Sequence, residues 1–289
     1  MIHLFLPLLA SILLVCGLIF IKRADGAGGP VTVLFLANMI SAGVFSLLWT
    51  LGGTMQPLSL LWQPLTIAVL FSLGLAFTFL AIEQGDVSIA TPVLGVKVIF
   101  VALILTVFVG EALPSTVWWA AVLAMLGIAV IQWTGNAHPK RAVFTITFAL
   151  LAATSFACFD VLVQQWASAW GAGRFLPIVY WMVGLLSLTM IPWVDFSLLR
   201  NPPIRRLLLP GAALIALQAV CITFAVANFG DAARINVVYA LRGLWSVLFA
   251  WIAAKIWGGA EAELDSVGLL TRLVGAVLLT TAVVLVIMS

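Results

Sequence analysis

The sequence predicts an all-α integral membrane protein with ten transmembrane helices, arranged as two inverted five-helix repeats. Three observations support this: a very apolar composition, long apolar segments, and short features that return at a fixed spacing. The chain is 64% hydrophobic and 8% charged, whereas soluble domains carry about 25% charged residues. We therefore interpret residues 1–289 as a single transmembrane domain.

Ten apolar segments follow one another along the chain, and each has about the length of a membrane-spanning helix. Between them lie most of the charged residues, with glycine, proline and asparagine. Residues 98–109 are apolar on every side, unlike a membrane β-strand, which alternates apolar and polar residues. Helices are expected instead, because a helix satisfies its backbone hydrogen bonds internally. The predicted spans are 4–21, 31–51, 64–83, 87–109, 115–133, 143–166, 175–193, 207–228, 232–256 and 266–288.

Three short features of the first half return 145 residues later, at one common offset. This spacing, which we call the repeat offset, predicts a first repeat over residues 1–138 and a second over residues 139–289. A repeat of five spans ends on the opposite side of the membrane from its start, so the second copy must be inverted. Secondary transporters often have this arrangement, with the substrate site between the repeats. The matches are 26–28 with 171–173, 85–86 with 230–231, and Lys97 with Arg242.

The loop charges predict the orientation of the chain. Nine cations lie in or near one set of loops, and only Arg174 and Arg234 lie on the opposite face. Cytoplasmic loops carry the excess of lysine and arginine, so we expect a multi-pass protein of the inner (plasma) membrane with both termini on the non-cytoplasmic side. Residues 1–21, which lack a basic leader, are then expected to be a permanent first span. The nine are Lys22, Arg23, Lys140, Arg141, Arg200, Arg205, Arg206, Lys255 and Arg272.

Lys97 and Arg242 are predicted to lie near the middle of the membrane. Each is about ten residues into its span, or about 15 Å at 1.5 Å per residue, in a hydrocarbon core of about 30 Å. A charge there costs about 2.5–3.5 kcal/mol on insertion scales. Both residues are therefore candidate substrate contacts for a carboxylate or phosphate, which arginine binds with two parallel hydrogen bonds and lysine as a compact charge. The alternative is that each one pairs with a buried acid or a carbonyl.

Asp160 is the only acid well inside a predicted span. Proton-coupled carriers often use such a residue as a relay, so Asp160 is a candidate coupling residue. A structural hydrogen bond or ion pair is the alternative. Because Asp160 comes late in its predicted span of 143–166, it is expected nearer the outer face, and pairing with Lys97 would need a long reach.

Aromatic side chains near the cations are further candidate substrate contacts. Tyr239 and Trp245, three residues before and after Arg242, share its predicted helical face and could stack on a planar or apolar group. Tyr180 in the seventh span is a similar candidate. Packing or lipid contact is the alternative for all three. Pro92, five residues before Lys97, removes a backbone donor and could bend its helix toward the cavity, although a plain packed kink fits equally well.

Other functional classes find little support in the sequence. The three cysteines and two histidines lack metal-ligand spacing, and no HExxH, GxxxxGKS/T or GxSxG motif occurs. We expect no enzymatic activity, cofactor, metal or nucleic-acid partner. The expected partners are a small-molecule substrate and the lipid bilayer, with a monomer and a homodimer both open.

The motifs around the fourth span resemble those of ten-helix EamA-type exporters in the drug/metabolite transporter superfamily. Residues 91–95 read Thr-Pro-Val-Leu-Gly, and residues 110–113 read Gly-Glu-Ala-Leu, whose Gly-Glu pair is similar to the family hallmark. The second half is more degenerate, with Gly-Gly-Ala-Glu at 258–261. The resemblance implies a basket of helices around a central cavity, alternating access, and export of small metabolites such as amino acids.

The charges favour one kind of cargo. Related small multidrug exporters keep a glutamate in the first span for cationic drugs and protons, and this chain has no acid there. Together with Lys97 and Arg242, this favours anionic or zwitterionic, carboxylate-bearing substrates. A flippase of a lipid or lipid-linked sugar is the alternative function.

Overall fold

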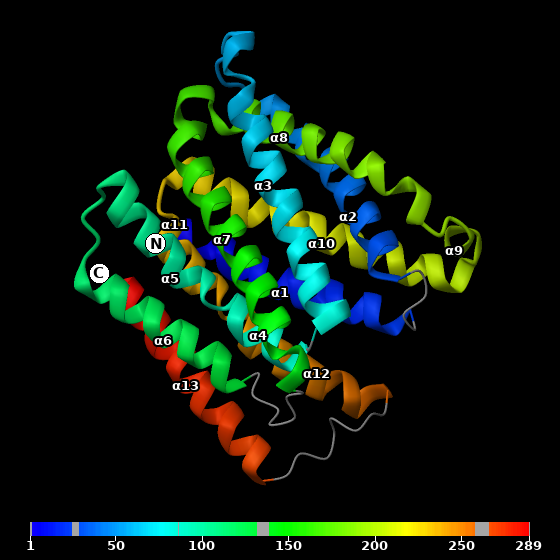
Figure 1. Cartoon of the computed structure of the whole chain (residues 1–289), viewed down its shortest axis with the longest axis vertical. Helices are drawn as coiled ribbons and strands as arrows, with labels where there is room; N and C mark the ends of the chain where they lie inside the picture. The colour runs from blue at the N-terminus through cyan, green and yellow to red at the C-terminus, as the bar shows by residue number, and fades with distance from the viewer. Residues whose placement is uncertain (1, 25–28, 86, 132–138, 258–265, 289) are drawn as a thin grey trace.

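The computed structural model describes residues 2–24, 29–85, 87–131, 139–257 and 266–288, and within them the chain is helical without strands (Figure 1). The triplet at 26–28, Asp86 and the motif at 258–261 lie outside the described residues. The helices are α1 Ile2–Arg23, α2 Gly29–Ser46, α3 Trp62–Phe79, α4 Val87–Leu94, α5 Lys97–Ile104, α6 Ser115–Ile131, α7 Pro139–Trp170, α8 Ala172–Ser187, α9 Ser197–Arg200, α10 Pro202–Phe229, α11 Ala232–Tyr239, α12 Arg242–Trp257 and α13 Ser266–Met288.

Eight helical stretches among the described residues are long and apolar enough to cross a membrane. The predicted span 115–133 corresponds to the shorter α6, and the predicted span 232–256 corresponds to α11 followed by α12. Large apolar side chains such as Leu58 and Phe108 are exposed, which suits contact with lipid. An all-helical, multi-pass membrane architecture is therefore confirmed, while the number of ten spans stays a prediction.

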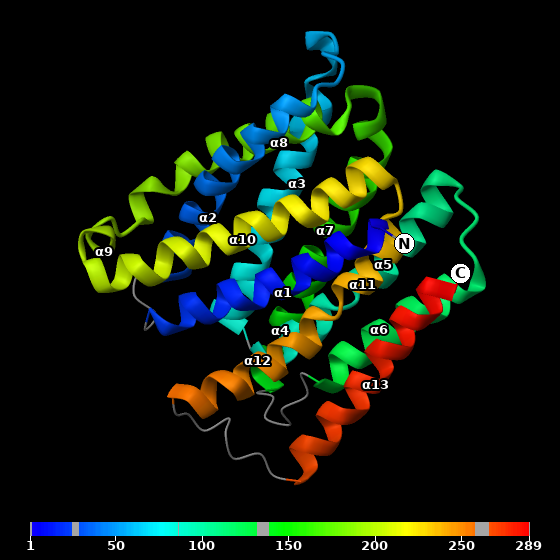
Figure 2. The ribbon, with the colours of Figure 1, turned by 180° about the vertical axis from the view of Figure 1, so that it is seen from behind.

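The helices pack in pairs across the molecule. α1 lies along α10, α3 lies along α7, and α6 lies along α13, while α2 packs against both α8 and α10. Figure 2 shows the α1–α10 and α6–α13 pairs side by side. The two chain ends lie close together, near the start of α11 and the start of α6 (Figures 1 and 2).

Glycines allow two of these pairs to approach closely. A Cβ on Gly17 of α1 would lie 2.9 Å from the carbonyl oxygen of Gly211 in α10. A Cβ on Gly275 of α13 would lie 2.9 Å from the carbonyl oxygen of Gly127 in α6. Small residues let membrane helices gain close van der Waals contact where no hydrophobic force separates helix from lipid.

Two helices are interrupted at equivalent positions. The chain turns at residues 95–96, between α4 and α5, and again at residues 240–241, between α11 and α12, which is one repeat offset further on. Hydrogen bonds between residues three apart tighten both turns, such as Gly95 N–H to the oxygen of Pro92 at 3.0 Å and Leu241 N–H to the oxygen of Val238 at 3.1 Å. Such a tight stretch inside a helix often marks a hinge.

Pro92 does not account for both interruptions. Val237 stands at the equivalent position of the second half, and the helix is broken there as well. What the two breaks share is that a cation begins the next helix: Lys97 in α5 and Arg242 in α12.

Candidate substrate site

Lys97 and Arg242 come together because helices from both halves of the chain meet around α7. α5 packs against α7 and α11, and α11 leads through the second break into α12. The charge of Arg242 acts electrostatically on Lys97. The start of a helix carries a partial positive charge, so the start of α5 adds to the positive potential around these two side chains.

Lys97 forms an ion pair with Asp160 of α7. Its Nζ lies 2.7 Å from Asp160 Oδ2, and the two side chains are only 13% and 4% exposed. Asn236 of α11 donates from Nδ2 to the same oxygen at 2.7 Å. Lys97 Nζ also lies 5.8 Å from the ring centroid of Phe156.

The expectation that this pairing would need a long reach is wrong. The sixth span was predicted to end at residue 166, but α7 continues to Trp170. Asp160 is therefore ten residues, or about 15 Å of helix, from the end of α7, and not close to the surface. Of the two readings of Lys97, the structure shows the ion pair directly.

Arg242 lies against an aromatic ring. Its Cζ is 4.6 Å from the ring centroid of Tyr239, the last residue of α11. Among the carboxylates whose side chains the structure describes, none pairs with the Arg242 guanidinium. The cluster of Lys97, Asp160 and Arg242 thus carries one positive charge that no described acid neutralises.

Trp245 turns away from this cluster. Its Nε1 donates to Ser11 Oγ of α1 at 3.0 Å, and that hydroxyl donates to the carbonyl oxygen of Leu8 at 2.6 Å. Ser11 is fully buried. Trp245 therefore ties α12 to α1, whereas its predicted partner Tyr239 contacts Arg242.

Tyr180 is a core residue of α8. It is 1% exposed, its ring stacks on Phe45 at a centroid distance of 3.6 Å, and its hydroxyl lies 3.2 Å from Thr223 Oγ1. It lies within electrostatic range of Asp160. The structure thus packs Tyr180 behind the ion pair, with its hydroxyl already engaged.

Asn236 and Phe156 belong to the cluster but were not among the predicted site residues. Asn236 is 2% exposed and also donates to the carbonyl oxygen of Ala232 at 2.9 Å. An asparagine inside an apolar span, six residues before Arg242, was a signal that the sequence offered. Phe156 carried no comparable signal, because apolar aromatics are common throughout the chain.

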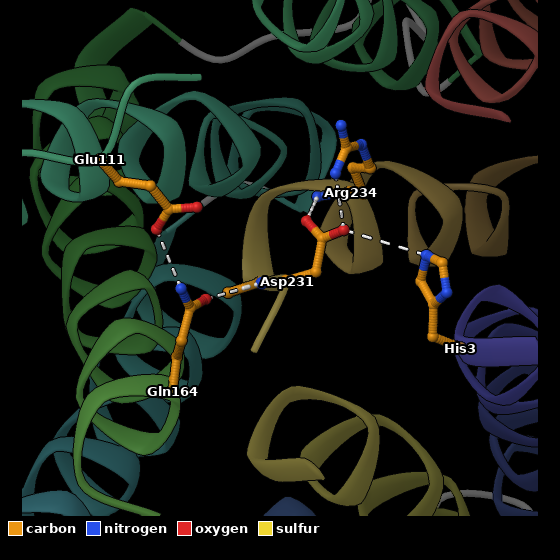
Figure 3. A network of polar contacts seen from close by, with 6 residues as sticks. His3, Glu111, Gln164, Asp231 and Arg234 are labelled. Carbon is orange, nitrogen blue, oxygen red and sulfur yellow. Dashed lines mark hydrogen bonds and ion pairs between the residues drawn. The ribbon is translucent and has the colours of Figure 1, made fainter. Parts of the chain in front are cut away.

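A second polar network lies at the start of α11, near the chain ends (Figure 3). Gln164 of α7 accepts from the Ala232 N–H at 2.8 Å and donates to Glu111 Oε2 at 3.0 Å. Asp231 accepts from Arg234 at 3.0 Å, and His3 Nε2 lies 3.9 Å from the same carboxylate oxygen. We call the end of the molecule formed by His3, Glu111 and Asp231 the termini face.

The Gly-Glu pair that carries the family resemblance stands in this network. Gly110 has a left-handed backbone, with φ of 78°, that ends the helix. Its neighbour Glu111 then turns back, with its N–H bonded to the oxygen of Leu105 at 3.0 Å. Residues 1–133 match the EamA-like transporter family. This match confirms the resemblance to the drug/metabolite transporter superfamily for the EamA-like half and identifies a membrane transporter of that type.

The other comparisons add the fold. A search of curated proteins finds no sequence that matches the chain. A crystal structure described only as that of a protein is similar, with 16% identity and a TM-score of 0.73 over 99% of this chain and 98% of its own. At this identity the likeness shows a common fold, so the EamA-like half and the remaining residues together form one known architecture.

Proposed function

We propose that the protein is a secondary transporter that exports small carboxylate-bearing metabolites, such as amino acids, by alternating access at a site between its two halves. Arg242 is the observation that carries this proposal. It lies in the interior beside an ion pair that is already satisfied, and it has no described acid of its own. A charge in the membrane interior usually marks a substrate or ion pathway.

The charge arrangement favours an anion as the ligand. Lys97 and Asp160 neutralise each other at 2.7 Å, so Arg242 leaves the cluster with one positive charge. A substrate carboxylate could accept two parallel hydrogen bonds from the guanidinium. The Tyr239 ring, which holds the guanidinium from one side, limits the orientations that Arg242 can adopt.

Helix pairing supports an inverted repeat with halves 1–138 and 139–289. A shift by the repeat offset converts the α1–α10 pair into the α7–α3 pair, and the α2–α10 pair into the α8–α3 pair. The two helix breaks obey the same shift. With both termini on the non-cytoplasmic side of the inner membrane, as the loop charges predict, the termini face would be the exit side.

Asp160 is the proposed coupling residue. When it is ionised, it holds Lys97; a proton on Asp160 would release the Lys97 ammonium to join Arg242 at the substrate anion. The groups around this carboxylate are Lys97, Asn236, Tyr180, Tyr239 and Arg242. Proton binding and substrate binding would then favour each other, as linkage requires.

Thermal stabilisation of the purified protein tests the proposal, since a ligand of the folded state raises the melting temperature. The probes are amino acids and small organic acids, each compared with its carboxamide and with the amine that lacks the carboxylate. Arg242→Gln is expected to weaken carboxylate binding about tenfold or more, because a charged hydrogen bond contributes about 1.5–3 kcal/mol. Arg205→Gln, which changes an exposed cation of α10, is the matched control.

The same panel in proteoliposomes then measures exchange of the ligands found. Equal stabilisation by carboxylates, carboxamides and amines would contradict the role of Arg242. Stabilisation by a lipid-linked sugar alone, without any soluble carboxylate, would favour the flippase instead.

A further inference from the structure

Two polar contacts, one helical turn apart, hold α11 against α7. Asn236 donates to Asp160 at 2.7 Å, and Gln164 accepts from the Ala232 N–H at 2.8 Å. Asp160 and Gln164 are four residues apart on α7, as are Ala232 and Asn236 on α11, so each pair shares one face of its helix. We call the first contact the inner rung and the second the outer rung.

Each rung also reaches the first half of the chain. At the inner rung Asp160 binds Lys97 of α5, and at the outer rung Gln164 donates to Glu111, which follows the same span. The rungs therefore join three segments, the end of the fourth predicted span, α7 and α11, at two depths. The inner rung lies at the candidate site, and the outer rung lies at the termini face (Figure 3).

The outer rung satisfies both ends of one side chain. The Gln164 amide donates with its nitrogen and accepts with its oxygen, so a single residue bridges Glu111 and the first N–H of α11. His3 and Arg234 add contacts to Asp231, the cap of the same helix. The first turn of α11 is thus held from α7, from the start of α1 and from the segment after α5.

We propose that Gln164 is a positioning residue for transport, and that the two rungs hold the termini face closed over Arg242. This rests on the alternating access of the proposed function. α11 has eight residues and leads directly to Arg242, so separation of α11 from α7 at the outer rung moves the segment that carries the site. A substrate anion that competes for Lys97 weakens the inner rung, and its binding then favours the open state.

The test uses a cysteine between the rungs. Ala233→Cys is placed in a chain whose Cys16, Cys158 and Cys221 are replaced by alanine, and a hydrophilic maleimide labels the protein in lipid nanodiscs. Ala233 is 2% exposed in the closed arrangement, so labelling reports opening. Gln164→Glu puts two carboxylates against each other at the outer rung, and its labelling is expected to be about fivefold faster or more, because exposure follows the free energy of local opening.

A compensating change separates positioning from general damage. In the Glu111→Gln/Gln164→Glu double variant, the new glutamine donates to the new glutamate, whose second oxygen accepts from the Ala232 N–H. Labelling should return to within about twofold of the parent rate. Gln164→Met, which removes both bonds without adding charge, should label faster, as Gln164→Glu does.

The matched control is Asn38→Leu. Asn38 of α2 donates to Ser187 of α8 at 2.8 Å, which is a buried bond between the two halves but away from α11. This variant should lower the melting temperature without faster labelling at residue 233. Parent-like labelling of Gln164→Glu and Gln164→Met, or failure of the double variant to restore slow labelling, overturns the proposal.

The two proposals fail in different ways. If no carboxylate stabilises the parent protein, the substrate assignment falls, but the labelling rates still report on the rungs. If carboxylates bind and exchange while labelling ignores Gln164, the substrate assignment stands and the positioning role is lost.

Discussion

Lys97 and Arg242 hold the same place in two broken helices, one in each half of the chain: each is the first residue after a two-residue interruption. Their environments nevertheless differ. Lys97 is paired with Asp160 at 2.7 Å, whereas Arg242 lies against the Tyr239 ring. The duplication therefore supplies two equivalent positions, of which one is neutralised and the other keeps its charge.

Removing the acid of the buried pair should be much more damaging than removing the pair. Asp160→Leu leaves Lys97 with a desolvated, unpaired charge and should lower stability by about 3–5 kcal/mol, because a broken buried ion pair leaves one charge uncompensated. Lys97→Met/Asp160→Leu removes both charges and should recover most of that loss. Thermal unfolding in detergent measures both variants. A double variant as unstable as Asp160→Leu would show that the carboxylate acts through another partner, such as Asn236.

The general architecture could be predicted from composition and span length, because the bilayer imposes both requirements on every apolar segment. The depth of Asp160 could not. A span boundary in an apolar sequence is weakly marked, and an error of four residues at the end of α7 displaced Asp160 by about 6 Å along the helix axis. That displacement was enough to make its contact with Lys97 look improbable.

The site was predictable where charge was the signal and unpredictable where packing decided. A cation inside an apolar span is costly, so Lys97, Arg242 and Asp160 stood out. The direction of Trp245 depends on the buried hydroxyl of Ser11, 234 residues away, and no local pattern announces that contact. The outer rung was hidden for a similar reason, because Gln164 binds a backbone N–H that has no sequence signature.

The ring of Tyr239 should contribute to substrate affinity through Arg242. Tyr239→Leu removes the aromatic face under the guanidinium, an interaction of about 0.5–2 kcal/mol, and is expected to weaken carboxylate binding about two- to thirtyfold. Tyr239→Phe keeps the ring and should retain most of the affinity. Ligand titrations followed by melting temperature give both values. Equal losses in the two variants would assign the effect to the hydroxyl and not to the ring.

Close packing of α1 on α10 should make Gly17 sensitive to a single methyl group. Gly17→Ala places a Cβ 2.9 Å from the backbone oxygen of Gly211 and should cost about 1–3 kcal/mol, because the backbones must separate. Gly43→Ala in α2 is the control, since its Cβ meets nothing within 4 Å. That variant should leave stability unchanged or raise it slightly, as alanine favours a helix by about 0.5–1 kcal/mol over glycine. The two melting temperatures, compared with that of the parent protein, contradict the packing argument if they shift alike.

Trp245 distinguishes a structural anchor from a substrate contact three residues after Arg242. Trp245→Phe keeps an aromatic ring but loses the donor to Ser11, a hydrogen bond with a net contribution of about 0.5–1.5 kcal/mol. The melting temperature should therefore fall while carboxylate affinity stays within about twofold, because the indole points to α1 and not to the guanidinium. Ser11→Ala removes the acceptor and should lower the melting temperature similarly, and the combination of both changes should add little. A loss of affinity in Trp245→Phe without one in Ser11→Ala would instead place the indole at the substrate.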